Sequence, residues 1–207
     1  NFPFTIIIYC VARNIEKSLT LISAQKTTLI DTCSVNNKRF VSIAGVGFDA
    51  HVAKLFAKSA RRGFLGYSRI VANEFLKYKS KNYHLKFDNG EEIFQRALFI
   101  AFANSNQFGY NTTIAPEASL VDGLMDICIV DKPKIYNLPS IANLLLLRKI
   151  ELSPFVRIIK AKKVTVTRKK KRVVNIDGEP IKFEKKLEVK INPLSLNIII
   201  NPHGSKV

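Results

Sequence analysis

Two acidic residues separated by glycine are the first candidates for chemistry in this chain. Residues 175–180 read NIDGEP, so Asp177 and Glu179 follow directly after a short apolar run. Carboxylates at this spacing can hold Mg²⁺ or a ribose hydroxyl, and one of them can accept a proton from an attacking hydroxyl. The alternative is a solvated hairpin turn, and the segment taken by itself favours that alternative.

A second polar stretch follows a buried strand. Residues 97–103 form an uninterrupted apolar run, and Asn104 and Gln107 come shortly after it. Further along, Asp122 and Gly123 predict a sharp turn into the next strand. A carboxylate beside turn carbonyls suits a hard cation, because Mg²⁺ and Ca²⁺ prefer oxygen ligands. An Asp-Gly turn without an ion explains the same residues equally well.

The third segment, GVGFDA at residues 45–50, predicts a turn from a strand into a helix. Glycine lets the backbone approach a ligand closely, so Gly47 and Asp49 are candidates for the wall of a cleft. A single GxG is weak evidence, and a tight turn with Asp49 as the helix N-cap is the simpler interpretation.

Other classes of site are not supported. The chain contains no GxxxxGK[ST] loop, no Gly-Gly pair and no Ser/His/Asp arrangement. Its three cysteines, Cys10, Cys33 and Cys128, are odd in number and widely spaced. This spacing argues against a disulfide framework and against zinc, and it favours a reducing compartment.

The hydrophobic pattern predicts the elements that position these residues. Helical spacing begins after Asn14 and again at Asp49, and one more helix is expected at residues 140–148. Elsewhere the period is two, with a hairpin turn at residues 88–90. Helices in the first third followed by runs of strands predict an α+β, mainly β domain, built as an antiparallel β-sandwich. The expected strands are residues 40–44, 83–87, 93–94, 97–103, 126–130, 162–167, 173–175, 187–191 and 196–200.

The charge balance limits the classes of partner that this chain is expected to bind. The formal net charge is +17, which attracts nucleic acid, an anionic membrane face or phosphorylated ligands. The apolar runs are too short for a membrane-spanning helix, and the first residues lack the pattern of a signal peptide. We therefore expect a cytoplasmic protein. The basic tract at residues 168–172 lies between two predicted strands, so it is expected at a hairpin tip.

Taken in order, GVGFDA, NSNQFGYNTTIAPEASLVDGLMDI and VNIDGEP resemble the C-terminal half of the bacterial diacylglycerol kinase family. That family includes sphingosine and ceramide kinases and shares its fold with NAD kinases. The resemblance extends from about residue 13 to residue 202 and implies an ATP- and Mg²⁺-dependent phosphotransferase. It also implies a separate nucleotide-binding domain with a Gly-Gly-Asp-Gly-Thr loop, which this chain lacks. Residues 1–12 do not fit the family pattern and are left as a remnant or unassigned segment, with the β-sandwich domain at 13–207.

The resemblance assigns roles residue by residue. Asp177 falls on the catalytic-loop aspartate, the base or Mg²⁺ organiser for the lipid hydroxyl, with Gly178 and Glu179 near the nucleotide or its metal. Asp122 falls on the aspartate of a structural Mg²⁺ site, to which Ser119 and Leu124 would contribute carbonyl oxygens. The family usually has two adjacent acids there, and this chain has valine in place of the first.

The phosphorylated lipid would lie in a membrane, which gives the basic surface a use. The expected membrane contacts are Arg168, Lys170 and Arg172, together with a cluster of Lys54, Lys58, Arg61 and Arg62. Without a nucleotide-binding domain, the chain alone is expected to be inactive as a kinase. A homodimer is possible through an exposed sheet edge.

Three other functions remain open from the residues. A non-enzymatic lipid-binding module is one, and an NAD kinase-like enzyme is another. A nucleic-acid-binding β-domain is disfavoured, because the aromatic residues do not alternate with basic residues as a stacking platform requires.

Overall fold

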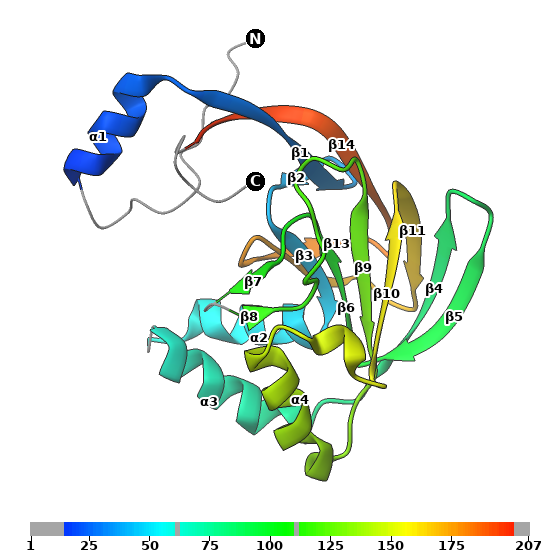
Figure 1. Cartoon of the computed structure of the whole chain (residues 1–207). Coiled ribbons are helices and arrows are strands. Elements are labelled where there is room, and N and C mark those ends of the chain that lie inside the picture. Colours follow the sequence, from blue (N-terminus) through cyan, green and yellow to red (C-terminus); the bar gives the residue numbers. More distant parts are fainter. Residues whose placement is uncertain (1–14, 61–62, 110–111, 201–207) are drawn as a thin grey trace.

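Two antiparallel six-stranded sheets dominate the computed structural model, which describes residues 15–60, 63–109 and 112–200 (Figure 1). This arrangement confirms the predicted antiparallel sandwich. The first sheet, in the order β2-β1-β14-β11-β4-β5, contains β1 (Thr27–Val35), β2 (Lys38–Phe40), β4 (Lys81–Phe87), β5 (Glu92–Ala97), β11 (Lys163–Arg168) and β14 (Lys186–Ile199). The second, in the order β10-β9-β6-β3-β12-β13, contains β3 (Ile43–Gly47), β6 (Phe99–Ala103), β9 (Met125–Val130), β10 (Val156–Ala161), β12 (Arg172–Ile176) and β13 (Glu179–Phe183).

Four α-helices and a small ribbon complete the described part of the chain. Helix α1 lies apart from the sandwich, at the far end of the ribbon formed by β1 and β14 (Figure 1). The remaining helices gather at the opposite end of the molecule. These elements are α1 (Ile15–Ala24), α2 (Phe48–Lys58), α3 (Gly63–Phe75), α4 (Leu138–Leu146), the 3₁₀ turns Ile135–Asn137 and Ile150–Leu152, and the ribbon β7 (Gln107–Gly109) with β8 (Thr112–Thr113).

The main core fills the space between the two sheets. Strand β4 alternates buried and more exposed residues, as expected for a strand with one face toward solvent. Strands β6 and β9 are instead buried almost throughout, because α4 covers their outer face with residues such as Ile141 and Leu145. The prediction of a doubly buried strand at residues 97–103 is confirmed for Phe99–Ala103 only, because Ala97 ends β5 and the chain changes sheets at Leu98.

Two separate strands were predicted at residues 187–191 and 196–200, but both belong to β14. It is one strand of 14 residues, interrupted by an irregularity in its pairing with β1 between Ile30 and Thr32. Pro193 cannot donate a ladder hydrogen bond, so the strand bulges there. Asp31 holds the bulge through a 2.7 Å hydrogen bond from the backbone N–H of Leu194.

Strand β1 itself was not predicted, because its polar residues lie inside. Asp31, Thr32 and Ser34 are all at most 5% exposed. Their side chains are satisfied within the structure; the Thr32 hydroxyl, for example, lies 2.7 Å from the hydroxyl of Ser195. Alternation of apolar and polar residues therefore does not report burial in this strand.

The basic tract is not a hairpin tip, so that prediction is wrong. Strand β11 pairs with β14 and β4, whereas β12 pairs with β3 and β13, so residues 169–171 cross from one sheet to the other. Arg168 is only 5% exposed, and its guanidinium donates hydrogen bonds to the carbonyl oxygens of Arg172, Phe183 and Glu184. Arg168 therefore fixes the crossover and is withdrawn as a membrane contact.

Gly47 is required by the close approach of two strands. Its φ is +97°, and a Cβ added there would lie 2.6 Å from the carbonyl oxygen of Leu98. The same residue is the N-cap of α2, so the chain can leave β3 and enter the helix only with glycine at this position. The candidate role of Gly47 in a cleft is thus explained by packing.

No helix within the described residues is long and apolar enough to cross a membrane. Residues 1–12 and the expected cap Asn14 lie outside the described residues, as do Arg61 and Arg62.

Candidate functional site

Asp177 and Gly178 form the two-residue turn of the β12–β13 hairpin. Both have positive φ, +46° and +94°, and the flanking residues Ile176 and Glu179 are paired across the ladder. Asp-Gly suits such a turn, because aspartate tolerates the left-handed region and glycine adopts it freely. The hairpin interpretation of this segment is therefore correct, but it does not describe what the Asp177 side chain does.

The Asp177 carboxylate binds the chain just before β3. Its Oδ2 accepts a 2.8 Å hydrogen bond from the N–H of Val41, and its Oδ1 accepts from Ser42 at 3.0 Å and Ile43 at 2.9 Å. The Asp177 N–H in turn donates to the Ile43 carbonyl oxygen at 2.9 Å. The residue is exposed and nevertheless held in one orientation.

Asn175 holds the hairpin from the other side. Its Oδ1 accepts a 3.0 Å hydrogen bond from the Gly178 N–H, and its Nδ2 donates to Asp49 Oδ2 at 2.9 Å. The prediction of Asp49 as an N-cap is wrong, because the N-cap of α2 is Gly47 and no side chain caps it. The Asp49 carboxylate instead lies over Gly45, where an added Cβ would be 2.0 Å from Oδ2.

Asp49 is 6% exposed, and burial raises the pKa of its carboxyl to about 6, against the opposing effect of the Asn175 hydrogen bond. Asp49 is too enclosed to form the wall of an open cleft. Its role in the described structure is to anchor Asn175, which the sequence analysis quoted within NIDGEP without assigning it a role.

Asn104 is a second buried anchor and not a cleft residue as expected. It is fully buried, and its Nδ2 donates to the carbonyl oxygens of Asp31 at 2.9 Å and Val41 at 2.7 Å. Val41 is therefore held by Asn104 at its carbonyl and by Asp177 at its N–H. The neighbouring hydroxyls of Ser42 and Ser105 lie 2.8 Å apart and tie the same segment to the end of β6.

Glu179 is the free acid of the hairpin. It opens β13, its residue is exposed, and within the described part of the chain its carboxylate has no ion pair or hydrogen bond. The hairpin therefore presents one carboxylate bound by main-chain amides and a second one available to a ligand. For Gln107 the structure describes the backbone in β7 only, so its predicted contact with substrate lies outside what is described.

The loop of Asp122 faces a lysine. Asp122 Oδ1 accepts a 3.0 Å hydrogen bond from the N–H of Leu124, while its Oδ2 accepts one from Lys160 Nζ at 3.3 Å. The same ammonium donates to Asp126 Oδ2 at 3.2 Å and to the Glu117 carbonyl oxygen at 3.3 Å. Ser119 contributes its hydroxyl to the turn, 3.3 Å from the N–H of Val121.

These residues do not fit the expected Mg²⁺ while Lys160 is in place. The ammonium already supplies a positive charge to the oxygens that would bind the ion. Among residues 15–60, 63–109 and 112–200, no group of three or more His, Cys, Asp or Glu side chains could hold a metal. No step of a reaction is assigned to this loop.

The substitution Lys160→Met tests this arrangement. Asp126, whose side chain is 4% exposed, would lose its cationic partner. We expect the free energy of unfolding to fall by about 1–3 kcal/mol, as for other unsatisfied buried polar groups. The control Lys163→Met breaks the exposed pair with Glu188 and should cost less than about 1 kcal/mol.

The dependence of thermal stability on metal ions distinguishes a loop neutralised by Lys160 from a loop neutralised by a bound metal. Thermal unfolding of the wild-type chain should not change when a chelator is added, whereas Mg²⁺ should partly restore Lys160→Met. A wild-type chain that loses stability with chelator would show that a metal, and not Lys160, neutralises the loop.

Comparison with known proteins agrees with this architecture. The profile of the family described as "YegS C-terminal NAD kinase beta sandwich-like domain" matches residues 42–200. Two curated relatives, both called "Probable lipid kinase YegS-like", come from Shewanella frigidimarina and an Enterobacter species. Each is 24% identical over 93% of this chain, which spans 62% of the first relative and 63% of the second.

Solved structures share the fold. A crystal structure of a diacylglycerol kinase from Bacillus anthracis matches 93% of this chain and 61% of its own chain, with a TM-score of 0.66 at 15% identity. Two further structures from that organism give TM-scores of 0.69. Because the family profile covers most of the residues, and all three segments singled out above, the chain belongs to the family of YegS C-terminal NAD kinase beta sandwich-like domains.

Proposed function

We propose that this chain is the lipid-binding and catalysis-completing domain of an ATP-dependent lipid kinase that phosphorylates a diacylglycerol-like hydroxyl. One observation carries the proposal: the exposed Asp177–Glu179 turn, in which one carboxylate is fixed by three main-chain amides and the other has no partner within the described residues. The names of the relatives, lipid kinase and diacylglycerol kinase, support this class of reaction.

Nucleotide binding is assigned to the part of those relatives that this chain does not cover. The chain spans less than two thirds of their length, so phosphoryl transfer would require the whole parent protein. Mg·ATP would supply the transferable phosphoryl group and the neutralising charge.

Asp177 would act on the lipid hydroxyl. A carboxylate has about four acceptor positions, and three N–H groups occupy three of them, which leaves one for the hydroxyl proton. As the lipid oxygen forms its bond to the γ-phosphorus, the bond from phosphorus to the bridging oxygen breaks and ADP departs. The hydroxyl proton passes to Asp177 and then to water.

Glu179 would contact the nucleotide or its Mg²⁺. Its oxygens are a donor type that Mg²⁺ accepts, and no described cation competes for them. Asn175 keeps the two acids in register through its hydrogen bond to Gly178. Catalysis of this kind depends mainly on positioning, which the anchored hairpin supplies.

A non-enzymatic lipid-binding module is the second candidate. The three hydrogen bonds of Asp177 account for an aspartate at this position even without chemistry. A parent protein that binds lipid but transfers no phosphate would support that candidate.

Glu179→Gln in the parent protein tests the proposed function. With radiolabelled ATP and a panel of diacylglycerol, a sphingoid base and NAD, we expect transfer to one lipid class and a loss of roughly 100-fold in the variant. The melting temperature should not change, since the Glu179 side chain makes no described hydrogen bond or ion pair. Glu91→Gln, an equally exposed acid on the β4–β5 turn, is the control and should be fully active.

Two results would contradict this proposal, the first for the lipid substrate and the second for the role of Glu179. Transfer to NAD and to no lipid would indicate an NAD kinase-like enzyme. Equal activity of Glu179→Gln and wild type would show that Glu179 takes no part in the reaction.

We further propose that the protein meets the membrane through the first turn of α3. Leu65 is 83% exposed and Phe64 is 54% exposed, and both follow a helix that carries the exposed lysines Lys54 and Lys58. Apolar side chains beside cations favour the boundary between lipid headgroups and acyl chains. The crossover residues Lys170 and Arg172 stay as additional candidates, without Arg168.

Replacing Phe64 and Leu65 with serine should weaken sedimentation with anionic vesicles by about tenfold, because the variant loses apolar area that the bilayer would bury. Leu194→Ser is the control, since Leu194 is 53% exposed at the β14 bulge and should leave binding unchanged. Equal binding by the double variant and wild type would contradict this membrane face.

A further inference from the structure

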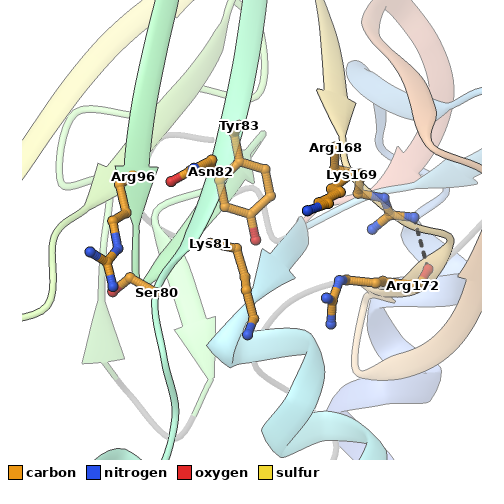
Figure 2. A pocket seen from close by; sticks show the side chains of 8 residues that line it. All are labelled: Ser80, Lys81, Asn82, Tyr83, Arg96, Arg168, Lys169 and Arg172. Atoms are coloured by element: carbon orange, nitrogen blue, oxygen red, sulfur yellow. Dashed lines mark hydrogen bonds between the residues drawn. The ribbon is translucent and has the colours of Figure 1, made fainter.

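A pocket of about 380 Å³ lies where the crossover between the sheets meets the start of β4 and the end of β5 (Figure 2). Its wall includes Lys81 and Tyr83 from β4, Arg96 from β5, Lys169 from the crossover and Arg172 from the start of β12. Three of its lining residues belong to the basic tract at residues 168–172, but no sequence motif considered above brings that tract together with β4 and β5.

The lining of the pocket carries positive charge that no acidic side chain in its wall neutralises. Arg168 also lines it, and no carboxylate does. Of the cations in its wall, Lys81, Arg96, Lys169 and Arg172 form no ion pair with any described residue. By contrast, Lys86, Lys163 and Lys171 elsewhere on the surface each pair with a glutamate.

Lys81 shows the effect of burial first and of the neighbouring cations second. Burial, together with the charges of Arg172, Lys79 and Arg96, lowers the pKa of its ammonium group. Cations held close together without counter-charges favour an anion from solution.

The donors are held in place and directed at one space. Arg168 fixes the crossover through its hydrogen bonds to carbonyl oxygens, and this sets the positions of Lys169 and Arg172. Figure 2 shows Lys81, Lys169, Arg172 and the hydroxyl of Tyr83 directed toward the same volume.

The Tyr83 hydroxyl adds a neutral donor to this group. It has no hydrogen-bond partner among the described residues, and no described side-chain polar atom is both buried and unpartnered. It therefore opens on the pocket.

This pocket is separate from the Asp177 hairpin. Arg172 begins β12 and Asp177 directly follows its last residue, so five steps of about 3.3 Å place them roughly 16.5 Å apart along the strand. An anion in the pocket is therefore not the phosphoryl group in transfer at Asp177.

We propose that this pocket binds a phosphate group, either free or carried by a lipid headgroup. Arginine presents paired N–H groups that match phosphate oxygens, and lysine adds a compact charge beside them. The volume admits a phosphate with a small substituent. The inference stands independently of the kinase reaction, because it depends only on this chain's own cations.

The test uses the 207-residue chain with Lys81→Gln and Arg172→Gln combined. Titration with inorganic phosphate at constant ionic strength, followed by NMR shifts of β4 and crossover amides, should show saturable binding by wild type. The double variant should bind at least about tenfold more weakly, as expected when two charge-assisted contacts are lost. Removing mutually repelling charges should not lower its melting temperature, which is measured alongside.

Lys182→Gln is the matched control, because it removes an exposed lysine on β13 that does not line the pocket. A second arm uses phosphatidylcholine vesicles with and without phosphatidic acid. Binding that requires phosphatidic acid and is competed by inorganic phosphate identifies a headgroup as the source, and phosphate binding without vesicle binding identifies a free phosphate.

The proposal is overturned if phosphate does not saturate any of these amides. It is also overturned if Lys182→Gln weakens binding as much as the double variant, which would show general attraction to a basic surface. Tight binding to a single-stranded oligonucleotide with no binding of phosphate would assign the surface to nucleic acid instead.

Discussion

Residues Val41, Ser42 and Ile43 connect the two sheets of the sandwich, and their main-chain groups are bound by side chains from distant parts of the chain. Asp177 accepts hydrogen bonds from all three N–H groups, and Asn104 donates to the carbonyl oxygen of Val41. Buried or half-buried main-chain groups need such partners wherever no ladder supplies them. This segment precedes β3, which pairs with both β6 and β12, so its placement aligns the centre of the second sheet.

The same contacts place the candidate chemistry at one edge of that sheet. Asn175 joins the hairpin to Asp49 on α2, so the turn is anchored to a helix as well as to a strand connection. Asp49 also contributes to a pH dependence of stability, because its folded-state pKa is raised to about 6 from 3.8. Its stabilising contribution is complete below about pH 4 and is lost as the pH rises through about 6. At neutral pH the burial of the charged Asp49 carboxylate costs free energy of folding. We infer that the position of Asn175 matters more here than local stability.

Sequence reasoning found the elements with local signals. The Asp-Gly hairpin turn, the doubly buried strand β6 and the alternation of β4 follow from residue type and spacing alone. It missed what depends on partners distant in sequence. Asn175 binds Asp49 across 126 positions, and Asp177 binds Val41 across 136, and no periodicity reports such contacts.

Polar residues inside the protein caused the other errors. Asn104 was expected in a cleft and Arg168 at a membrane, and Asp31 was given no role, yet each is buried and binds main-chain groups. Lys160 similarly occupies the loop in which the family resemblance placed a metal. In each case a polar side chain forms hydrogen bonds with other groups of the same chain. The spacing of residues in the sequence cannot distinguish such a side chain from one that binds a ligand.

The most direct test of this account is the rate of phosphoryl transfer by the parent protein carrying Asp177→Asn, measured per folded molecule with the lipid that wild type prefers. Through its single side-chain oxygen, asparagine can still accept the hydrogen bonds of Ser42 and Ile43, but its Nδ2 cannot accept from Val41 and it cannot take the hydroxyl proton, so the rate is compared only among folded molecules. The account predicts a loss of at least about 100-fold in kcat with little change in the KM for lipid. A variant that folds and transfers phosphate at nearly the wild-type rate would show that Asp177 only supports the fold.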